Sequence, residues 1–257
     1  ISLLYYSDRL MEFPLGLFGI ALATVTLPYL SRQAANRSMR EFADTVDWSM
    51  RLVVLIATPA AVGLIVLAGP LVATIFYGGE FTAFDVEMAA LSLQAFAAGL
   101  IGFSFVKILA PAYFAREDTK TPVRVGLIAL AVNFTLSVIL AYVLTQAGYA
   151  GTHAGLALAI SIAAIVNAWL LYRGLRRDGV VSESQGWMAL LLRVIAANAV
   201  MVIGIRYLDR PLDWWLVAGV LERAWWLGVV VTVGVVAYFA VLWLLGTRVR
   251  HFRHGTG

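Results

Sequence analysis

The sequence predicts an all-α, polytopic membrane protein with about seven transmembrane helices. The chain has 257 residues, of which 61% are hydrophobic and only 13% are charged. Its mean hydropathy is +0.86, whereas a soluble domain of this length needs a more charged surface. Long apolar runs fill most of the chain, and the Lys and Arg content of the connecting loops alternates. These observations together indicate repeated membrane crossings.

The apolar runs give the expected spans in order. About 20 residues cross the hydrocarbon core of a bilayer, and the uncharged runs that meet or approach this length are 13–30, 52–79, 88–106 and 224–247. The uncharged run 125–172 is too long for one helix, and the glycine-containing stretch 145–153 divides it into two. The run 187–208 is counted as well, because Arg193 and Arg206 lie near its ends and can extend toward the interface.

The loops predict the orientation of these spans. Basic clusters occur in every second connection: Arg32, Arg37, Arg40 and Arg51; Arg116, Lys120 and Arg124; Arg173, Arg176 and Arg177; and, in the tail, Arg248, Arg250 and Arg253. The connections 77–85 and 145–153 contain neither Lys nor Arg, and 206–215 is balanced by acidic residues. Cytoplasmic loops collect Lys and Arg, so the clusters and the C-terminal tail are expected on the cytoplasmic side.

Several classes of function do not fit this composition. The chain has no cysteine and three histidines, two of them in the tail, so no metal site is expected. The sequence shows no phosphate-binding loop, nucleophile motif or zinc motif, so we expect no enzyme activity. The pI of about 9.5 reflects loop clusters that face anionic lipids, and no nucleic-acid partner is expected. The chain opens on Ile1 without an initiator methionine, which favours a fragment.

Charged residues directly before the first uncharged run, 13–30, are the main candidates for function. If this segment is helical, Asp8 and Glu12 lie one turn apart on a shared face with Arg9 beside them. A charge at mid-bilayer costs about 2.5–3.5 kcal/mol on insertion scales, so such groups turn to a partner or a wet cavity. One interpretation is a juxtamembrane ion pair that only orients the helix. The other is an arginine that lines a polar cavity and binds a phosphate with two hydrogen bonds.

Other polar residues in the apolar stretches leave alternatives open. Lys107 can extend toward the cytoplasmic interface or face the same cavity as Arg9. Asn133 and Asn167 lie in mid-span, where interhelical hydrogen bonds are more common than cation ligation. Glu222 and Arg223 open the last helix and are predicted to form an interfacial ion pair. Helix breaks, which are common in transporters, are expected at or near Pro28, Pro59, Pro70, Pro111 and Pro122.

Two long motifs of the chain are specific enough to indicate a family. The stretch 5–32, which begins Tyr-Tyr-Ser-Asp-Arg-Leu-Met-Glu-Phe-Pro, closely resembles the eighth helix of the MurJ (MviN-type) family of lipid II flippases. The stretch 107–124, from Lys-Ile-Leu-Ala-Pro to Lys-Thr-Pro-Val-Arg, resembles the tenth helix and the loop after it. The shorter segments 78–85 and 186–189 also fit. The likeness runs from end to end of the chain but covers only the second half of a fourteen-helix protein.

The resemblance implies an architecture and an activity. Residues 1–178 would be the C-terminal lobe of a multidrug/oligosaccharidyl-lipid/polysaccharide (MOP) superfamily exporter. Residues 179–257 would add two helices that form a groove for a lipid tail, followed by a basic cytoplasmic tail. The family moves the undecaprenyl-pyrophosphate-linked peptidoglycan precursor, lipid II, from the inner to the outer leaflet by alternating access. The expected location is the bacterial cytoplasmic (inner) membrane, and the expected partners are lipid II, membrane lipids and the N-terminal half of the same protein.

The resemblance also implies roles for individual residues. The family's cavity is cationic, and its arginine falls on Arg9, with Asp8 and Glu12 at matching acidic positions. Lys107 is the other candidate for substrate binding. Some members carry a monovalent cation site in the C-terminal lobe, for which Asn133 is the candidate here, although Ser137 one turn later provides no carboxylate. No cofactor is expected beyond such a coupling cation.

Three rival functions remain as alternatives. The nearest is a related exporter of another polyprenyl-linked oligosaccharide, against which the two long motifs argue. The second is a membrane-embedded enzyme acting on the same lipid, for which Glu80 and Asp85 are the only plausible outer-loop carboxylates. The third is a non-transporting scaffold for cell-wall synthesis.

Overall fold

The structure is a computed structural model, and it describes residues 6–12, 15–16, 30, 32, 38–148, 151–181 and 186–246. Apart from turns, this part of the chain is helical. The elements are α2 (Met39–Val66), α3 (Ala68–Phe76), α4 (Ala83–Phe114), α5 (Lys120–Gln146), α6 (Thr152–Arg177), α7 (Trp187–Leu208), α8 (Leu212–Val217) and α9 (Val220–Leu244). Six of these helices, all except α3 and α8, are long and apolar enough to cross a membrane. The all-helical membrane fold is thus confirmed, while most of the first predicted span, 13–30, lies outside the described residues.

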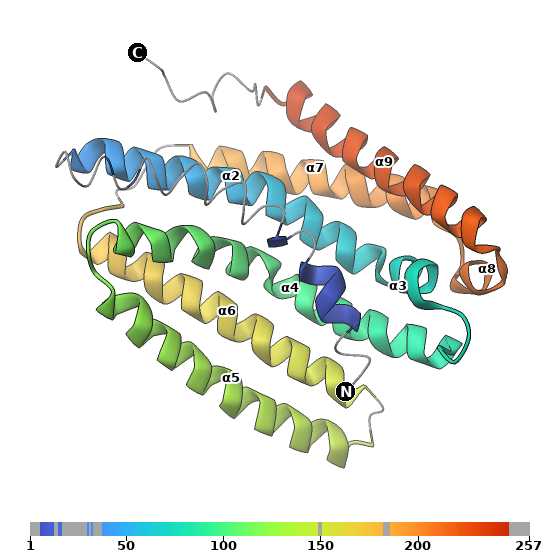
Figure 1. Ribbon diagram of the computed structural model, residues 1–257. Helices are drawn as coiled ribbons and strands as arrows, with labels where there is room; N and C mark the ends of the chain where they lie inside the picture. Colours follow the sequence, from blue (N-terminus) through green and yellow to red (C-terminus); the bar gives the residue numbers. More distant parts are fainter. Residues whose placement is uncertain are drawn as a thin grey trace.

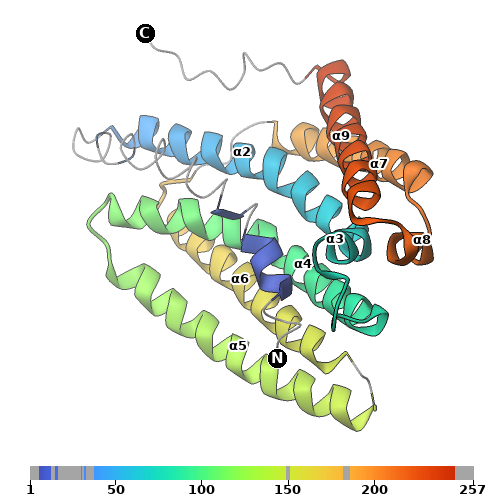
Figure 2. The same cartoon turned by 45° about the vertical axis from the view of Figure 1, so that its right-hand side comes forward.

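The long helices form two groups joined by α2 (Figure 1). In the first group α4 packs along α6, and α6 packs along α5. In the second group α7 packs along α9. Helix α2 contacts α4 on one side and α7 on the other. Figure 2 shows α9 crossing the direction of the other helices steeply, so the second group is not a simple continuation of the first.

Two of the predicted basic clusters, at 116–124 and 173–177, lie at one end of the bundle, whereas the tail cluster at 248–253 lies outside the described residues. In Figure 1 the left end holds the starts of α2, α5 and α7 and the ends of α4 and α6. An ion pair between Arg116 Nη1 and Asp178 Oδ2, 3.1 Å long, joins the ends of α4 and α6 there. The turns at 77–85 and 145–153 and the loop at 206–215 are at the opposite end. The helices therefore run alternately, as the loop charges predict.

Small residues allow α4 and α6 to approach closely. A Cβ atom on Gly99 would lie 2.6 Å from Ser161 Cα, and one on Gly102 would lie 2.8 Å from the backbone nitrogen of Ile165. The Ser161 hydroxyl donates a 2.7 Å hydrogen bond to the carbonyl of Ala95. Where lipid replaces water, close van der Waals packing and such interhelical hydrogen bonds hold helices together. This contact is the centre of the first group.

Replacing Gly99 with alanine is expected to destabilise the protein by about 1–3 kcal/mol, because the added methyl group meets backbone that cannot move aside. Gly126 on α5 is a matched control, since a Cβ there meets nothing within 4 Å. Gly126→Ala is expected to be neutral or slightly stabilising, as alanine favours helix more than glycine does. The free energy of unfolding in micelles measures both, and equal values for the two variants would contradict the close packing.

Two helices are longer than the apolar runs that predicted them. Helix α2 begins at Met39 rather than at residue 52, and α4 extends from Ala83 to Phe114 rather than over 88–106. The expected bounds were placed at charged residues such as Arg51 and Lys107. A charged side chain marks where a helix leaves the hydrocarbon or finds a polar partner, but it does not stop the helix. By contrast, α7 has the predicted bounds 187–208.

The expectation of helix breaks at or near prolines is wrong at Pro59, which lies inside α2. Pro111 lies in the last turn of α4, which ends at Phe114, and Pro122 lies in the first turn of α5. Pro28 lies outside the described residues. A proline removes one hydrogen bond, whereas a full break in an apolar setting would leave more polar groups unsatisfied. Pro70 does lie next to a break, at Leu67 between α2 and α3. There the side-chain amide of Gln94 donates a 3.2 Å hydrogen bond to the carbonyl of Ile65, near the end of α2.

The prediction of an interfacial pair between Glu222 and Arg223 is wrong, because Arg223 is buried and only 6% exposed. Its Nε donates to the carbonyl of Ala218 at 2.9 Å, and its Nη1 donates to that of Ala73 at 2.8 Å. The guanidinium also lies 5.3 Å from the centre of the Tyr77 ring. The last carbonyls of a helix lack intrahelical donors and carry partial negative charge. Arg223 therefore caps α3 from the start of α9.

Arg223→Met is expected to lower the free energy of unfolding by about 1–3 kcal/mol, because it removes the donors from buried carbonyls. The exposed Arg177 at the end of α6 is the control, and Arg177→Met is expected to change stability little. Thermal unfolding followed by tryptophan fluorescence compares the two. Equal melting temperatures for the two variants would show that water can replace the Arg223 guanidinium without loss of stability.

Candidate functional site

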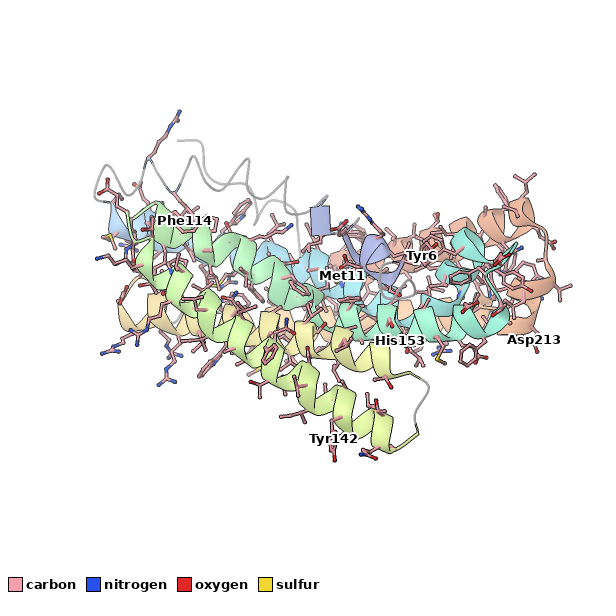
Figure 3. The ribbon with its side chains drawn as sticks, turned by 60° about the horizontal axis from the view of Figure 1, so that its bottom comes forward. Tyr6, Met11, Phe114, Tyr142, His153 and Asp213 are labelled. Atoms are coloured by element: carbon pink, nitrogen blue, oxygen red, sulfur yellow. The ribbon has the colours of Figure 1, made fainter. Side chains whose placement is uncertain are left out.

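The N-terminal segment lies on α4 and turns one face inward. Residues 6–12 are helical, and the Ser7 hydroxyl donates a 2.8 Å hydrogen bond to the carbonyl of Ala89. One turn later Met11 is buried in a cluster with Phe96 and Leu100. Tyr6 lies beside the same surface (Figure 3), with its ring 4.8 Å from that of Phe76. Ser7 and Met11 therefore fix one face of the segment against the bundle, so the opposite face points outward.

The charged residues predicted for the site lie on this outward face. Arg9 Nη1 and Glu12 Oε2 are 3.3 Å apart, and their side chains are 59% and 54% exposed. Asp8 is half-buried beside them. An ion pair this exposed contributes at most about 1 kcal/mol, so an anionic ligand can replace Glu12 at little cost. The structure brings Arg9 and Glu12 together as the sequence predicts, while their role in binding stays a prediction.

Lys107 reaches the same N-terminal segment. It is exposed on α4, and its Nζ donates a 3.1 Å hydrogen bond to the carbonyl of Leu15. The ammonium group therefore lies against the N-terminal segment at Leu15, while a cavity shared by Lys107 and Arg9 stays a prediction. Lys107 thus places a second positive charge on the side of the bundle that the N-terminal segment covers. The sequence alone does not decide this placement, because Lys107 is separated from Arg9 by nearly 100 residues.

The candidate for cation ligation, Asn133, forms a local pair. The Ser137 hydroxyl donates a 3.3 Å hydrogen bond to Asn133 Oδ1, and both residues are on α5. This bond occupies one lone pair of the amide oxygen that a cation would need. No carboxylate partners Asn133 in the described hydrogen bonds, and the cation site stays a prediction.

The carboxylate of Asp85, a candidate in the enzyme alternative, has a structural role. Its Oδ2 accepts hydrogen bonds from the backbone nitrogen and the hydroxyl of Thr82, at 2.8 and 2.6 Å. The Thr82 hydroxyl in turn accepts from the Asp85 backbone nitrogen. These reciprocal bonds form a capping box at the start of α4. A carboxylate held in this way is poorly placed to act as a base.

An apolar groove of about 390 Å³ runs between α2, α7 and α9. The Tyr238 hydroxyl donates a 2.8 Å hydrogen bond to the carbonyl of Leu55 and so holds α9 on α2. Gly63 and Gly234 both line the groove; a Cβ atom on Gly63 would meet nothing within 4 Å, whereas one on Gly234 would lie 3.0 Å from Ile205 Cδ1. Its other lining residues are Ile56, Pro59, Ala60, Leu64, Leu67, Leu71, Met201, Ile205, Val231, Val235, Tyr238 and Phe239. The sequence predicts a lipid-tail groove from the last two long helices alone, whereas this groove is also lined by α2; its role stays a prediction.

A polar junction joins the starts of α2 and α7 at the basic end of the bundle. Trp187 Nε1 donates a 2.8 Å hydrogen bond to Asp47 Oδ1. The other oxygen of Asp47 pairs with Arg51 Nε at 2.7 Å, and the Arg51 guanidinium lies 5.2 Å from the centre of the Trp187 ring. Helix α7 therefore contacts α2 in two places: at its own first residue, Trp187, and along the apolar groove.

Comparisons with known proteins agree with one another. A family model described as "Lipid II flippase MurJ" matches residues 1–224. A probable lipid II flippase MurJ of Vibrio cholerae is 45% identical over 256 residues, which are 100% of this chain and 47% of that protein. The corresponding protein of Haemophilus influenzae is 41% identical, over 98% of this chain and 49% of its own length. A lipid II flippase MurJ of Burkholderia cenocepacia is 34% identical, over 98% and 48%.

A solved structure shares the fold. A lipid II flippase MurJ in an inward closed conformation superposes with a TM-score of 0.72 at 23% sequence identity. The superposition covers 99% of this chain and 48% of that one. The chain therefore spans about half the length of the curated relatives and of the solved structure that it matches.

Proposed function

Because the chain belongs to the MurJ family of lipid II flippases, we propose that it forms the C-terminal half of a transporter that moves lipid II across the bacterial cytoplasmic membrane. The remaining half of the family fold supplies the other wall of the cavity. The observation that carries the proposal is the match of the family model over residues 1–224. The positions of Arg9 and Lys107 and the apolar groove support it.

The proposed role of Arg9 follows from the charge of the substrate. A pyrophosphate in hydrocarbon would be prohibitively costly, because an isolated ion loses its hydration. A wet cavity lined by guanidinium and ammonium groups lowers this barrier. In the proposal, Arg9 contacts the pyrophosphate with two hydrogen bonds, Lys107 adds positive charge, and Asp8 or Glu12 competes for Arg9 so that the substrate can leave.

The groove between α2, α7 and α9 is proposed to hold the polyprenyl tail. Its walls are apolar, so a hydrocarbon chain gains contacts there and loses no hydrogen bonds. This assignment divides the chain into a transport lobe at 1–178 and a tail-binding helix pair at 179–257. The pair is proposed to keep the tail next to the protein while the head passes through the cavity.

The proposed orientation places the basic end of the bundle and the C-terminus in the cytoplasm, according to the positive-inside rule. Transport then runs from the inner to the outer leaflet by alternating access. A potential of 100 mV supplies about 2.3 kcal/mol per charge moved, which is enough to bias such a cycle. Coupling to a monovalent cation through Asn133 is part of the proposal, and no organic cofactor is needed.

The test uses the full-length protein. Purified and placed in vesicles, it is expected to move labelled lipid II between leaflets, and expressed in a strain depleted of its own lipid II flippase it is expected to restore growth. Transport of a different polyprenyl-linked oligosaccharide, but not of lipid II, would favour the related-exporter alternative. Restored growth with no translocation in vesicles would favour a scaffold. Conversion of lipid II to a new product would favour an enzyme.

A further inference from the structure

A polar pocket of about 490 Å³ lies at the end of the bundle opposite the basic clusters. We call it the outer pocket. Three parts of the chain enclose it: the junction of α2 and α3, the first turns of α4, and the stretch from the end of α7 into α8. Its polar lining residues are Glu87, Gln94, Arg206, Asp209 and Arg210. None of these residues belongs to the transport site proposed above.

The charges of the outer pocket balance and are only partly used within the protein. Glu87 and Arg206 are both exposed, and neither takes part in an ion pair among the described residues. Asp209 accepts hydrogen bonds from the Arg210 backbone nitrogen at 2.9 Å and from Trp215 Nε1 at 3.3 Å. Burial raises the pKa of the Asp209 carboxyl above its ordinary value. Two guanidinium groups and two carboxyl groups thus line one cavity and form no direct ion pair among the described residues, although the charge of Arg206 partly opposes the effect of burial on the pKa of Asp209.

Arg210 is held in position by aromatic rings. Its guanidinium carbon lies 4.9 Å from the centre of the Trp226 ring and 5.9 Å from that of Trp214. Its backbone carbonyl accepts a 3.2 Å hydrogen bond from Trp215 Nε1. A stacked guanidinium keeps its N–H groups in the plane of its edge, where they remain available to an oxygen ligand. The cation is therefore oriented before any ligand arrives.

We propose that the outer pocket binds the headgroup of a zwitterionic phospholipid that carries a primary ammonium, a phosphoethanolamine lipid. Its phosphate would contact Arg206 and Arg210, because guanidinium groups match phosphate oxygens. Its ammonium would donate hydrogen bonds to Glu87 and to the side-chain oxygen of Gln94. The apolar part of the lining, which includes Leu91 and Leu212, would contact the start of an acyl chain.

The lining selects among headgroups. An anionic headgroup would use the two arginines but would leave Glu87 facing a negative ligand. A quaternary ammonium has no N–H group to donate and is instead bound by aromatic faces. Here Arg210 already covers the rings of Trp214 and Trp226, and Trp215 is fully buried. A primary ammonium beside a phosphate is therefore the headgroup that satisfies both signs of charge.

The test is native mass spectrometry of the delipidated full-length protein, titrated with phosphatidylethanolamine, phosphatidylcholine and phosphatidylglycerol of identical acyl chains. We expect phosphatidylethanolamine to bind about fivefold more tightly than either of the others, a difference typical of one or two exposed charged contacts. Arg206→Gln is expected to weaken binding of all three, since all contain phosphate. Glu87→Gln is expected to weaken phosphatidylethanolamine alone and to remove the preference.

Glu80→Gln and Arg177→Gln are the matched controls, because both residues are exposed and lie outside the outer pocket. They are expected to bind as the unmodified protein does. Equal or tighter binding of phosphatidylglycerol by the unmodified protein would overturn the proposal, as would an unchanged headgroup preference in Glu87→Gln. The measurement contains no transport step. A negative binding result would therefore not contradict the proposed transport of lipid II, and a loss of transport would not contradict the proposed headgroup binding.

Discussion

Arg9→Ala is expected to reduce translocation of lipid II by the full-length protein about tenfold or more, while the protein still reaches the membrane. Arg9 lies on the outward face of the N-terminal segment, more than half exposed and paired only weakly with Glu12. Loss of a charge-assisted contact to phosphate removes about 1.5–3 kcal/mol, and each 1.4 kcal/mol is a factor of ten. Arg9→Lys is also expected to impair transport, because lysine keeps the charge but loses the planar pair of donors.

Two further variants sharpen this prediction. Glu12→Gln removes the competing carboxylate, so precursor binding is expected to tighten and release to slow. Arg177→Ala removes an exposed arginine at the basic end of α6 and is expected to leave transport unchanged. Initial rates with labelled lipid II in vesicles measure all of them. Normal transport by Arg9→Ala would mean that the Arg9–Glu12 pair only orients its helix.

Gly63→Phe is expected to slow transport of lipid II with its natural tail by about tenfold, because it fills the groove between α2, α7 and α9. Gly63 lines that groove, and a Cβ atom there meets nothing within 4 Å. The backbone can therefore carry a side chain at this position, and the new ring is expected to enter the groove. It would occupy the space in which the polyprenyl chain gains its van der Waals contacts.

The length of the lipid tail provides the decisive comparison for this variant. A precursor with a tail of only a few prenyl units needs little of the groove, so Gly63→Phe is expected to transport it at the normal rate. Gly228→Phe is the control, since Gly228 lies on α9, also faces open space, and is not part of the groove. Equal inhibition with short and long tails would show that the groove does not hold the tail.

Apolar run length and loop charge predicted the spans well where a helix is bounded by the interface on both sides. Helix α7 has the predicted bounds because residues 187–208 are flanked by a glycine and an aspartate. The same rule failed at α2, where Arg40 and Glu41 continue the helix beyond the apolar run. Charge indicates the polarity of the surroundings, whereas helix ends depend on local capping and packing.

The candidate site was predictable only in its local part. The contact between Arg9 and Glu12 follows from helical spacing, and the structure has it. The placement of Lys107 beside Leu15 depends on how two distant segments pack, and spacing holds no information about that. Arg223 was assigned to Glu222 because they are adjacent in sequence, although its partners Ala73 and Tyr77 come from another helix. The outer pocket is assembled from segments more than 100 residues apart and was therefore not foreseen.

The cap that Arg223 places on α3 has a consequence for motion during transport. The helix is interrupted at Leu67, where the backbone angles depart from those of an α-helix, and beyond that point α3 is tied to the start of α9 through the Arg223 guanidinium. If the chain bends at Leu67, α3 should consequently stay with the start of α9, while the Tyr238–Leu55 hydrogen bond keeps the later part of α9 on α2. Spin labels at Thr74 and Glu222 should then keep a constant separation through the cycle, while labels at Thr74 and Leu52 should report two distances.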